Sequence, residues 1–138
     1  MKILTKAKPL VYSCSGCSSA AQMANYLAVQ LDRKGIAEMS CIAGVGGNVK
    51  KLVHIALSGR KIIVIDGCPL ACSKACLSNY SIIPDLQIEL SRLGVPKKEH
   101  EDFNQQEAAD LLEMIQTTVS KFETTPYATY YYEALKQL

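Results

Sequence analysis

The sequence carries little net charge and no block of basic residues. It has 15 Lys and Arg against 13 Asp and Glu, which gives a formal net charge of +2 at pH 7. Nucleic-acid-binding domains usually present a clustered basic face, and anionic membranes attract similar clusters. We therefore predict that the chain has neither a nucleic-acid partner nor a membrane partner.

The sequence also lacks an apolar run suited to a membrane. Residues 9–31 carry no charge, but serine, glutamine and asparagine recur through them, which makes the stretch too polar for a spanning helix. The apolar stretch before Ser13 is only residues 9–12, shorter than the core of a secretory signal peptide. We therefore expect a cytoplasmic protein.

No linker, internal repeat or low-complexity segment interrupts the chain. Its 138 residues are 49% hydrophobic, which is enough to bury the core of one domain. We therefore predict a single domain over residues 1–138.

Hydrophobic patterns typical of strands and helices alternate along the chain. The apolar runs predict strands at 10–12, 38–43, 62–65 and within 85–90, and helices at 20–31, 49–57, 69–79, 108–122 and 127–135. This order predicts a three-layer α/β fold, Rossmann-like or flavodoxin-like. Its sheet would be four-stranded and mainly parallel, with helices on both faces.

Six cysteines are the most unusual feature of the composition. In a parallel sheet the carboxyl ends of the strands lie on one edge, where ligands bind. Two cysteines follow the first predicted strand, one ends the second, and two follow the third. We expect these five thiols to converge at that edge; they are Cys14, Cys17, Cys41, Cys68 and Cys72. Cys76 ranks below them, as a residue that packing alone could explain.

Clustered thiolates predict a metal site, with zinc as the first choice. Zinc is commonly held by four Cys or His ligands, and a CxxC spacing supplies two of them from one turn. Pro69 suits the first turn of a helix, which would place Cys68 at a helix N-terminus that favours the thiolate. Two alternatives remain. One is an iron–sulfur cluster, and the other is metal-free thiol–disulfide chemistry at Cys14 and Cys17, with Cys41 or Cys68 as the resolving thiol.

Other polar groups are weaker candidates. The glycines at 44–47 lack the lysine of a phosphate-binding loop, so a small anion or a thiol partner beside the cysteines is a secondary prediction. We expect His54 to be an ordinary helix residue, and His100 and the carboxylates between Glu99 and Glu107 to be solvated; no catalytic residue is assigned. The tyrosines at 127–132 are expected to dock the last helix on the domain, with a homodimer contact as the alternative.

The segments that hold the cysteines resemble a known family. The similar segments are CSGCSSAAQMANYLAVQLDRKG, EMSCIAGVGG and IIVIDGCPLACSKACL. They resemble the DGC-domain family, named for the motif found here at Asp66, Gly67 and Cys68. The resemblance is strong over residues 9–76 and looser elsewhere, including LSRLGVPK. It implies a DGC-type α/β domain that binds zinc through its cysteines, with no established reaction; the positions carried over are Cys14, Cys17, Cys41, Cys68 and Cys72.

Overall fold

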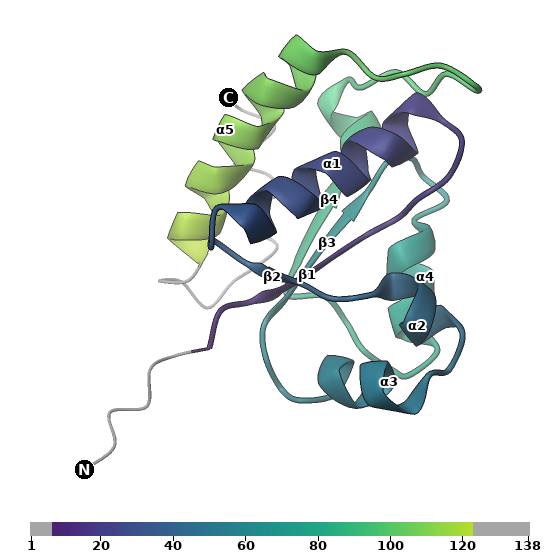
Figure 1. The fold of residues 1–138 in the computed structure, drawn as a ribbon, viewed down its shortest axis with the longest axis vertical. Coiled ribbons are helices and arrows are strands. Elements are labelled where there is room, and N and C mark those ends of the chain that lie inside the picture. The colour runs from purple at the N-terminus through teal and green to yellow at the C-terminus, as the bar shows by residue number, and fades with distance from the viewer. Residues whose placement is uncertain (1–6, 123–138) are drawn as a thin grey trace.

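The structure, a computed structural model, describes residues 7–122. These residues contain a four-stranded sheet in which every pair of neighbouring strands is parallel. The strands lie in the order β2-β1-β3-β4 (Figure 1); they are β1 (Leu10–Ser13), β2 (Glu38–Met39), β3 (Ile62–Asp66) and β4 (Leu86–Glu89). The predicted α/β fold with a parallel sheet is confirmed.

Helices cover both faces of the sheet. Helices α1 (Ser19–Arg33) and α5 (Gln105–Phe122) pack on one face. The other face carries α2 (Ile42–Gly46), α3 (Lys50–Ala56) and α4 (Cys72–Ser78), and a short 3-10 helix, η1 (Leu90–Leu93), follows β4. The chain steps from β1 outward to β2 and then back across β1 to β3. Right-handed connections therefore place α1 and the α2–α3 pair on opposite faces.

The two central strands are buried on both faces. All residues of β1 and β3 are buried, and alternate side chains enter two separate cores. The core under α1 and α5 takes Val11, Ile63 and Ile65, and the core under the other helices takes Leu10, Tyr12, Ile62 and Val64. A strand buried on both faces needs an unbroken apolar run, which is why residues 62–65 have no polar alternation.

The second predicted strand is wrong over its last residues. Strand β2 ends at Met39, and the chain then forms helix α2, with Cys41 as its N-cap. A Cβ atom on Gly44 would lie 1.9 Å from the Leu52 side chain, so this glycine allows α2 to pack closely against α3. Gly44 and Gly46 are thus residues of helix α2.

The predicted start of α4 is also wrong. The helix begins at Cys72, after Ala71 in a left-handed conformation, and Pro69 lies in the preceding loop. Cys68 therefore lies between β3 and α4, while Cys72 and Cys76 stand one turn apart on the helix. Asn48 is not the N-cap of α3, a position that Val49 takes.

The Asn104 side chain accepts the Glu107 N–H at 2.8 Å and caps the start of α5. The last predicted helix and its tyrosines, with the proposed homodimer contact, lie outside the described residues. Within residues 7–122, no helix combines the length and the apolar character needed to cross a membrane.

Candidate metal centre

The strand order marks one place on the sheet where a ligand is expected. Strands β1 and β3 are neighbours, but the chain leaves β1 for α1 on one face and leaves β3 for α4 on the other. Open α/β sheets bind ligands outside the carboxyl ends of the strands at such a switch point. Cys14 directly follows β1, and Cys68 follows β3 after one residue, so both lie at this point.

The Asp66 carboxylate fixes the start of helix α4. It is fully buried and accepts the Ser73 N–H at 2.9 Å and the Lys74 N–H at 3.2 Å. These N–H groups belong to the first turn of α4 and have no partner within the helix. A residue at the end of β3 thus serves as the cap that Ala71 cannot supply, and it holds Cys72 at the mouth of the sheet.

Gly67 brings the loop after β3 against the start of α1. A Cβ atom at this position would lie 2.6 Å from the carbonyl carbon of Ala20 and 2.7 Å from its oxygen, closer than real atoms approach. Its N–H group donates to the Cys14 sulfur at 3.3 Å. Only glycine permits this approach, so the Asp-Gly-Cys motif ties the loop after β3 to the thiol after β1.

The Cys14 thiol is half-buried beside other sulfurs. Burial raises its pKa to about 11, the Gly67 N–H opposes that rise, and nearby Asp66, Cys72 and Cys68 add to it. The thiol is therefore protonated at neutral pH in the absence of a cation. A bound dication reverses this preference, because it stabilises the thiolate strongly.

Cys68 and Cys72 form a looser group of thiols with Cys14, and the three sulfurs do not all lie within 4.8 Å of one another. Cys68 is half-buried, and the Lys97 ammonium donates to its sulfur at 3.5 Å. Cys72 is exposed as the first residue of α4. Two serine hydroxyls next to the group in sequence, those of Ser13 and Ser73, are buried without a hydrogen-bond partner in the described part of the chain.

Cys41 and Cys76 lie on either side of helix α2. Cys41 is exposed, and its sulfur accepts the Gly44 N–H at 3.4 Å as the cap of α2. The Cys76 sulfur lies against Gly46, where an added Cβ atom would approach it to 3.0 Å. Burial raises the pKa of the Cys76 thiol, and nearby Cys72 and Asp66 raise it further.

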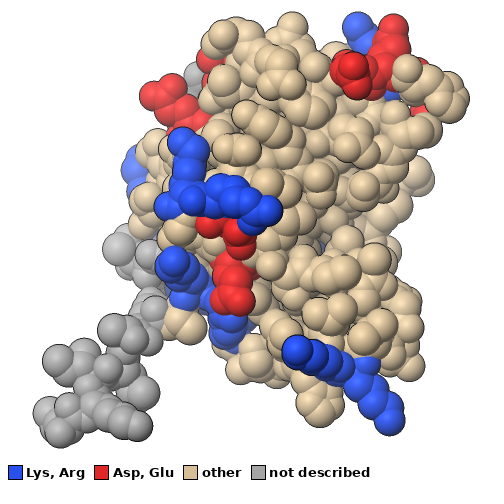
Figure 2. Space-filling model, in the orientation of Figure 1, with Lys and Arg blue, Asp and Glu red and all other residues tan. Residues whose placement is uncertain are grey.

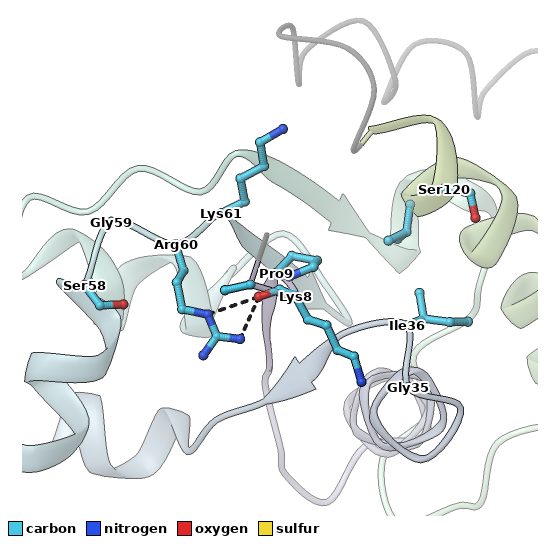
Figure 3. Close-up of a pocket in the computed structure, with 11 residues that line it drawn as sticks. Lys8, Pro9, Gly35, Ile36, Ser58, Gly59, Arg60, Lys61 and Ser120 are labelled. Carbon is cyan, nitrogen blue, oxygen red and sulfur yellow. Dashed lines mark hydrogen bonds between the residues drawn. The ribbon is translucent and has the colours of Figure 1, made fainter. Parts of the chain in front are cut away.

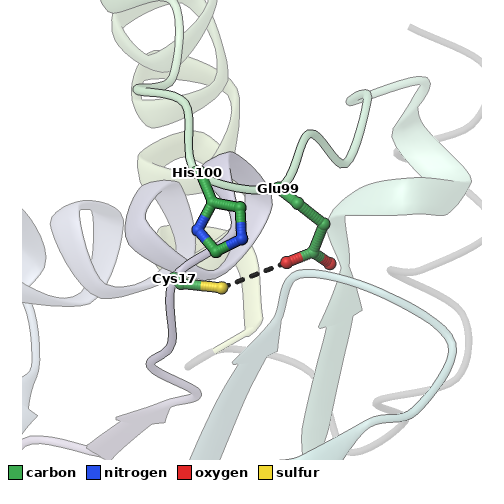
Figure 4. A group of neighbouring side chains, drawn as sticks. All are labelled: Cys17, Glu99 and His100. Atoms are coloured by element: carbon green, nitrogen blue, oxygen red, sulfur yellow. Dashed lines mark hydrogen bonds between the residues drawn. The ribbon is translucent and has the colours of Figure 1, made fainter.

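Cys17 lies beside a different set of residues. Its thiol donates to the Glu99 carboxylate at 3.0 Å, and the His100 ring lies beside the same sulfur (Figure 4). The hydrogen bond to Glu99 raises the pKa of the Cys17 thiol. Within residues 7–122, one group of three possible ligands has donor atoms that all lie within 4.8 Å of one another: Cys17, Glu99 and His100.

Sequence reasoning passed over Glu99 and His100 because they belong to a charged loop that was expected to be solvated. Both side chains are exposed, as expected, but the loop lies beside Cys17. A usable signal existed. This loop follows β4 and η1, and the carboxyl end of β4 lies on the same edge of the sheet as those of β1 and β3.

A separate hollow lies at the opposite edge of the sheet. It has a volume of about 710 Å³ and is lined by residues that include Lys8, Pro9, Gly35, Arg60 and Lys61, at the amino ends of β1 and β3 (Figure 3). The Arg60 guanidinium donates to the Lys8 carbonyl and pairs with Glu38 at 2.8 Å. Its charge therefore serves the fold, and no cysteine lines the hollow.

Comparison with known proteins identifies the family. A family model described as the DGC domain matches residues 10–115. The chain belongs to the DGC-domain family. It is 55% identical over 103 residues to the anaerobic and virulence modulator AnvM of Pseudomonas aeruginosa, an alignment that covers 75% of this chain and 79% of AnvM. No solved structure matches the chain. The resemblance read from the cysteine segments is thus confirmed.

Proposed function

We propose that this DGC-domain protein binds a zinc ion through cysteine thiolates at the carboxyl edge of its sheet. The observation that carries the proposal is the hydrogen bond from the Gly67 N–H to the Cys14 sulfur. It joins the thiol after β1 to the loop that holds Cys68, and Asp66 anchors Cys72 next to them. Cys14, Cys68 and Cys72 are the proposed ligands, and Cys41, the N-cap of α2, is proposed for the fourth position.

The residues present fit a zinc ion. Thiolates are among the preferred ligands of zinc, and a metal-bound thiol loses its proton. Cys14 is held in a buried position that favours the neutral thiol, so a dication there would displace a proton. The hydroxyls of Ser13 and Ser73 are further polar groups on the same elements, and neither has a hydrogen-bond partner among the described residues. Bound zinc would supply positive charge that holds the loops after β1 and β3 together.

We propose a binding or sensing role in the cytoplasm. The related AnvM is named as an anaerobic and virulence modulator. The susceptibility of a thiolate to oxidation rises with its exposure, so an exposed thiolate site suits a role in sensing oxidants. All six cysteines are free, which suits the reducing conditions of the cytoplasm.

The test is zinc content together with thiol counting on protein purified without oxygen. We expect about one tightly held zinc per chain after desalting, as for a thiolate site. Cys68→Ser and Cys72→Ser should each lose it, and Cys76→Ser is the matched control, since it removes a thiol one turn further along α4. Retained zinc in Cys68→Ser would contradict the proposal, and Cys41→Ser tests the fourth ligand.

Thiol–disulfide exchange is the second candidate, favoured by the contact between Lys97 and Cys68. A cation beside a thiol assists the thiolate that attacks a disulfide. In this reaction a disulfide in a partner molecule accepts two electrons and two protons and becomes two thiols. Two thiols of this chain give up those electrons and protons and join in one S–S bond. A metal-free protein with a reversible bridge would favour this function over zinc binding. Iron and sulfide in the purified protein would instead indicate a cluster.

A further inference from the structure

We propose that Cys17, Glu99 and His100 form a second zinc site, open to solvent and separate from the thiolate group. Figure 4 shows the three side chains pointing toward one another from two segments of the chain. Their donor atoms, one sulfur, one oxygen and one nitrogen, lie within 4.8 Å of one another. All three donor types are accepted by zinc, at bond lengths of about 2.0 to 2.3 Å. Small rotations of exposed side chains would therefore be enough to enclose an ion.

The backbone that carries these residues is fixed in place. The Ser19 N–H donates to the Lys98 carbonyl at 2.9 Å, and the Lys98 N–H donates to the Ser19 hydroxyl at 2.9 Å. The same hydroxyl contacts the Pro96 carbonyl at 3.3 Å. Ser19 is buried at the first turn of α1 and follows Cys17 by two residues. The loop is therefore held beside Cys17 by contacts that do not involve the proposed ligands.

His100 adopts an uncommon backbone conformation. Its φ angle is 60°, in the left-handed region that residues other than glycine seldom occupy, although His, Asn and Asp enter it more often than most. The conformation places the His100 ring beside the Cys17 sulfur (Figure 4). Strained backbone of this kind gathers at functional sites, where the surrounding structure maintains it.

The charge around the group suits a cation. Glu101 and Asp102 follow His100 and are exposed, so Glu99 is one of three carboxylates in this stretch. Figure 2 shows acidic side chains gathered at the corner where the chain of Figure 1 passes from η1 to α5. Lys97 and Lys98 are exposed on the preceding side, and Lys97 contacts Cys68. The acidic part of the loop is thus the part that adjoins Cys17.

The ligand count determines how the site behaves. Structural zinc sites are closed by four protein ligands, whereas three protein ligands leave a position for water or an incoming group. Cys17, Glu99 and His100 are all exposed, so a zinc ion there exchanges with the solution. The site uses none of Cys14, Cys68 and Cys72, and it does not depend on the zinc ion proposed for them.

The experiment is a titration of the reduced, metal-free full chain with Zn²⁺, and with Co²⁺ as a coloured probe of the same ligands. We expect a second equivalent that is removed by desalting. Glu99→Gln and His100→Ala should each weaken the binding of this second zinc ion. The loss of affinity should exceed the roughly 10- to 100-fold caused by removing a residue that only hydrogen-bonds to a ligand. The matched controls are Glu101→Gln in the same loop and His54→Ala on α3, which should leave this binding unchanged.

The outcomes separate the two sites. The inference would be overturned if the weakly bound zinc ion remains in both Glu99→Gln and His100→Ala. It would also be overturned if His54→Ala weakens the binding of this ion equally. Absence of any second equivalent would overturn it as well. In a Cys68→Ser, Cys72→Ser double variant the exchangeable ion should persist while the tight one disappears. If the wild-type protein binds the exchangeable zinc ion but no tightly held one, only the function proposed above is contradicted.

Discussion

The carboxyl edge of the sheet has a buried half and an exposed half, and they are built differently. In the buried half, Asp66, Gly67 and Cys14 are joined by backbone hydrogen bonds and close packing, so their chemistry is inseparable from the fold. In the exposed half, Cys17, Glu99 and His100 contact one another at the surface, on segments held by other residues. Substitutions in the first half should therefore change stability, and those in the second should change binding alone.

The largest effect is expected from Gly67→Ala. The added methyl group would meet the Ala20 backbone at 2.6 Å, and backbone cannot move aside as a side chain can. We expect a loss of about 3 kcal/mol in the free energy of unfolding, the upper end of the usual cost of overpacking. Urea unfolding of metal-free protein measures it. Gly16→Ala is the control, since its added atom would make an ordinary 3.7 Å contact with Ala21; equal losses in both variants would refute the packing argument.

Asp66→Ala should have the next largest effect. It removes the acceptor of two N–H groups at the start of α4 and leaves the Ser73 N–H unpaired in a buried position. We expect a loss of about 2 kcal/mol, the sum of a lost cap and an unpaired donor. Asp66→Asn keeps one acceptor oxygen and should lose less, as thermal and urea unfolding would show. A stable Asp66→Ala variant would mean that α4 has another cap.

The Cys14 thiol should be slow to alkylate in metal-free protein. Its pKa of about 11 lies above the ordinary value of 9.0, so below pH 9 its thiolate is about 100-fold scarcer than that of an ordinary cysteine. Iodoacetamide labelling followed by peptide mass spectrometry should show the rate rising up to pH 11. Because the folded protein holds this proton more tightly than the unfolded chain does, Cys14 also makes the fold less stable as pH rises from 9 toward 11. Rapid labelling at pH 8 would show that Cys14 is not held as described.

The smallest effect on stability is expected in the exposed half. Glu99→Gln and His100→Ala remove exposed side chains, so the free energy of unfolding should change by less than about 0.5 kcal/mol. The same two variants are used in the zinc titration, where both should bind the exchangeable zinc ion more weakly than the wild-type protein. A large loss of stability in either variant would place the exposed half within the fold and remove the contrast.

The sequence predicts the buried half better than the exposed half. The uninterrupted apolar run at 62–65 identifies β3, and the alternation of strands and helices implies a parallel sheet whose loops meet at one edge. These two steps suffice to place Cys14 next to the loop that carries Cys68. They rest on burial, which leaves a clear pattern in the sequence.

The features that the sequence did not predict depend on contacts between distant residues. Helix α2 contains glycines, which disfavour helix formation. The close packing of Gly44 on Leu52 explains why a helix forms there. Helix α4 takes its cap from Asp66 in the preceding strand, so Pro69 gave a misleading start. Glu99 and His100 reach Cys17 because Lys98 bonds to Ser19, a contact across 79 positions that no local pattern reveals.

One short stretch, residues 96–100, serves both sulfur groups. Lys97 contacts Cys68, while Glu99 and His100 flank Cys17, and the stretch is attached to α1 chiefly through Ser19. A displacement of this segment would therefore separate Glu99 and His100 from Cys17, and Lys97 from Cys68, in a single movement. A change at one sulfur group is thus passed to the other through the same few residues.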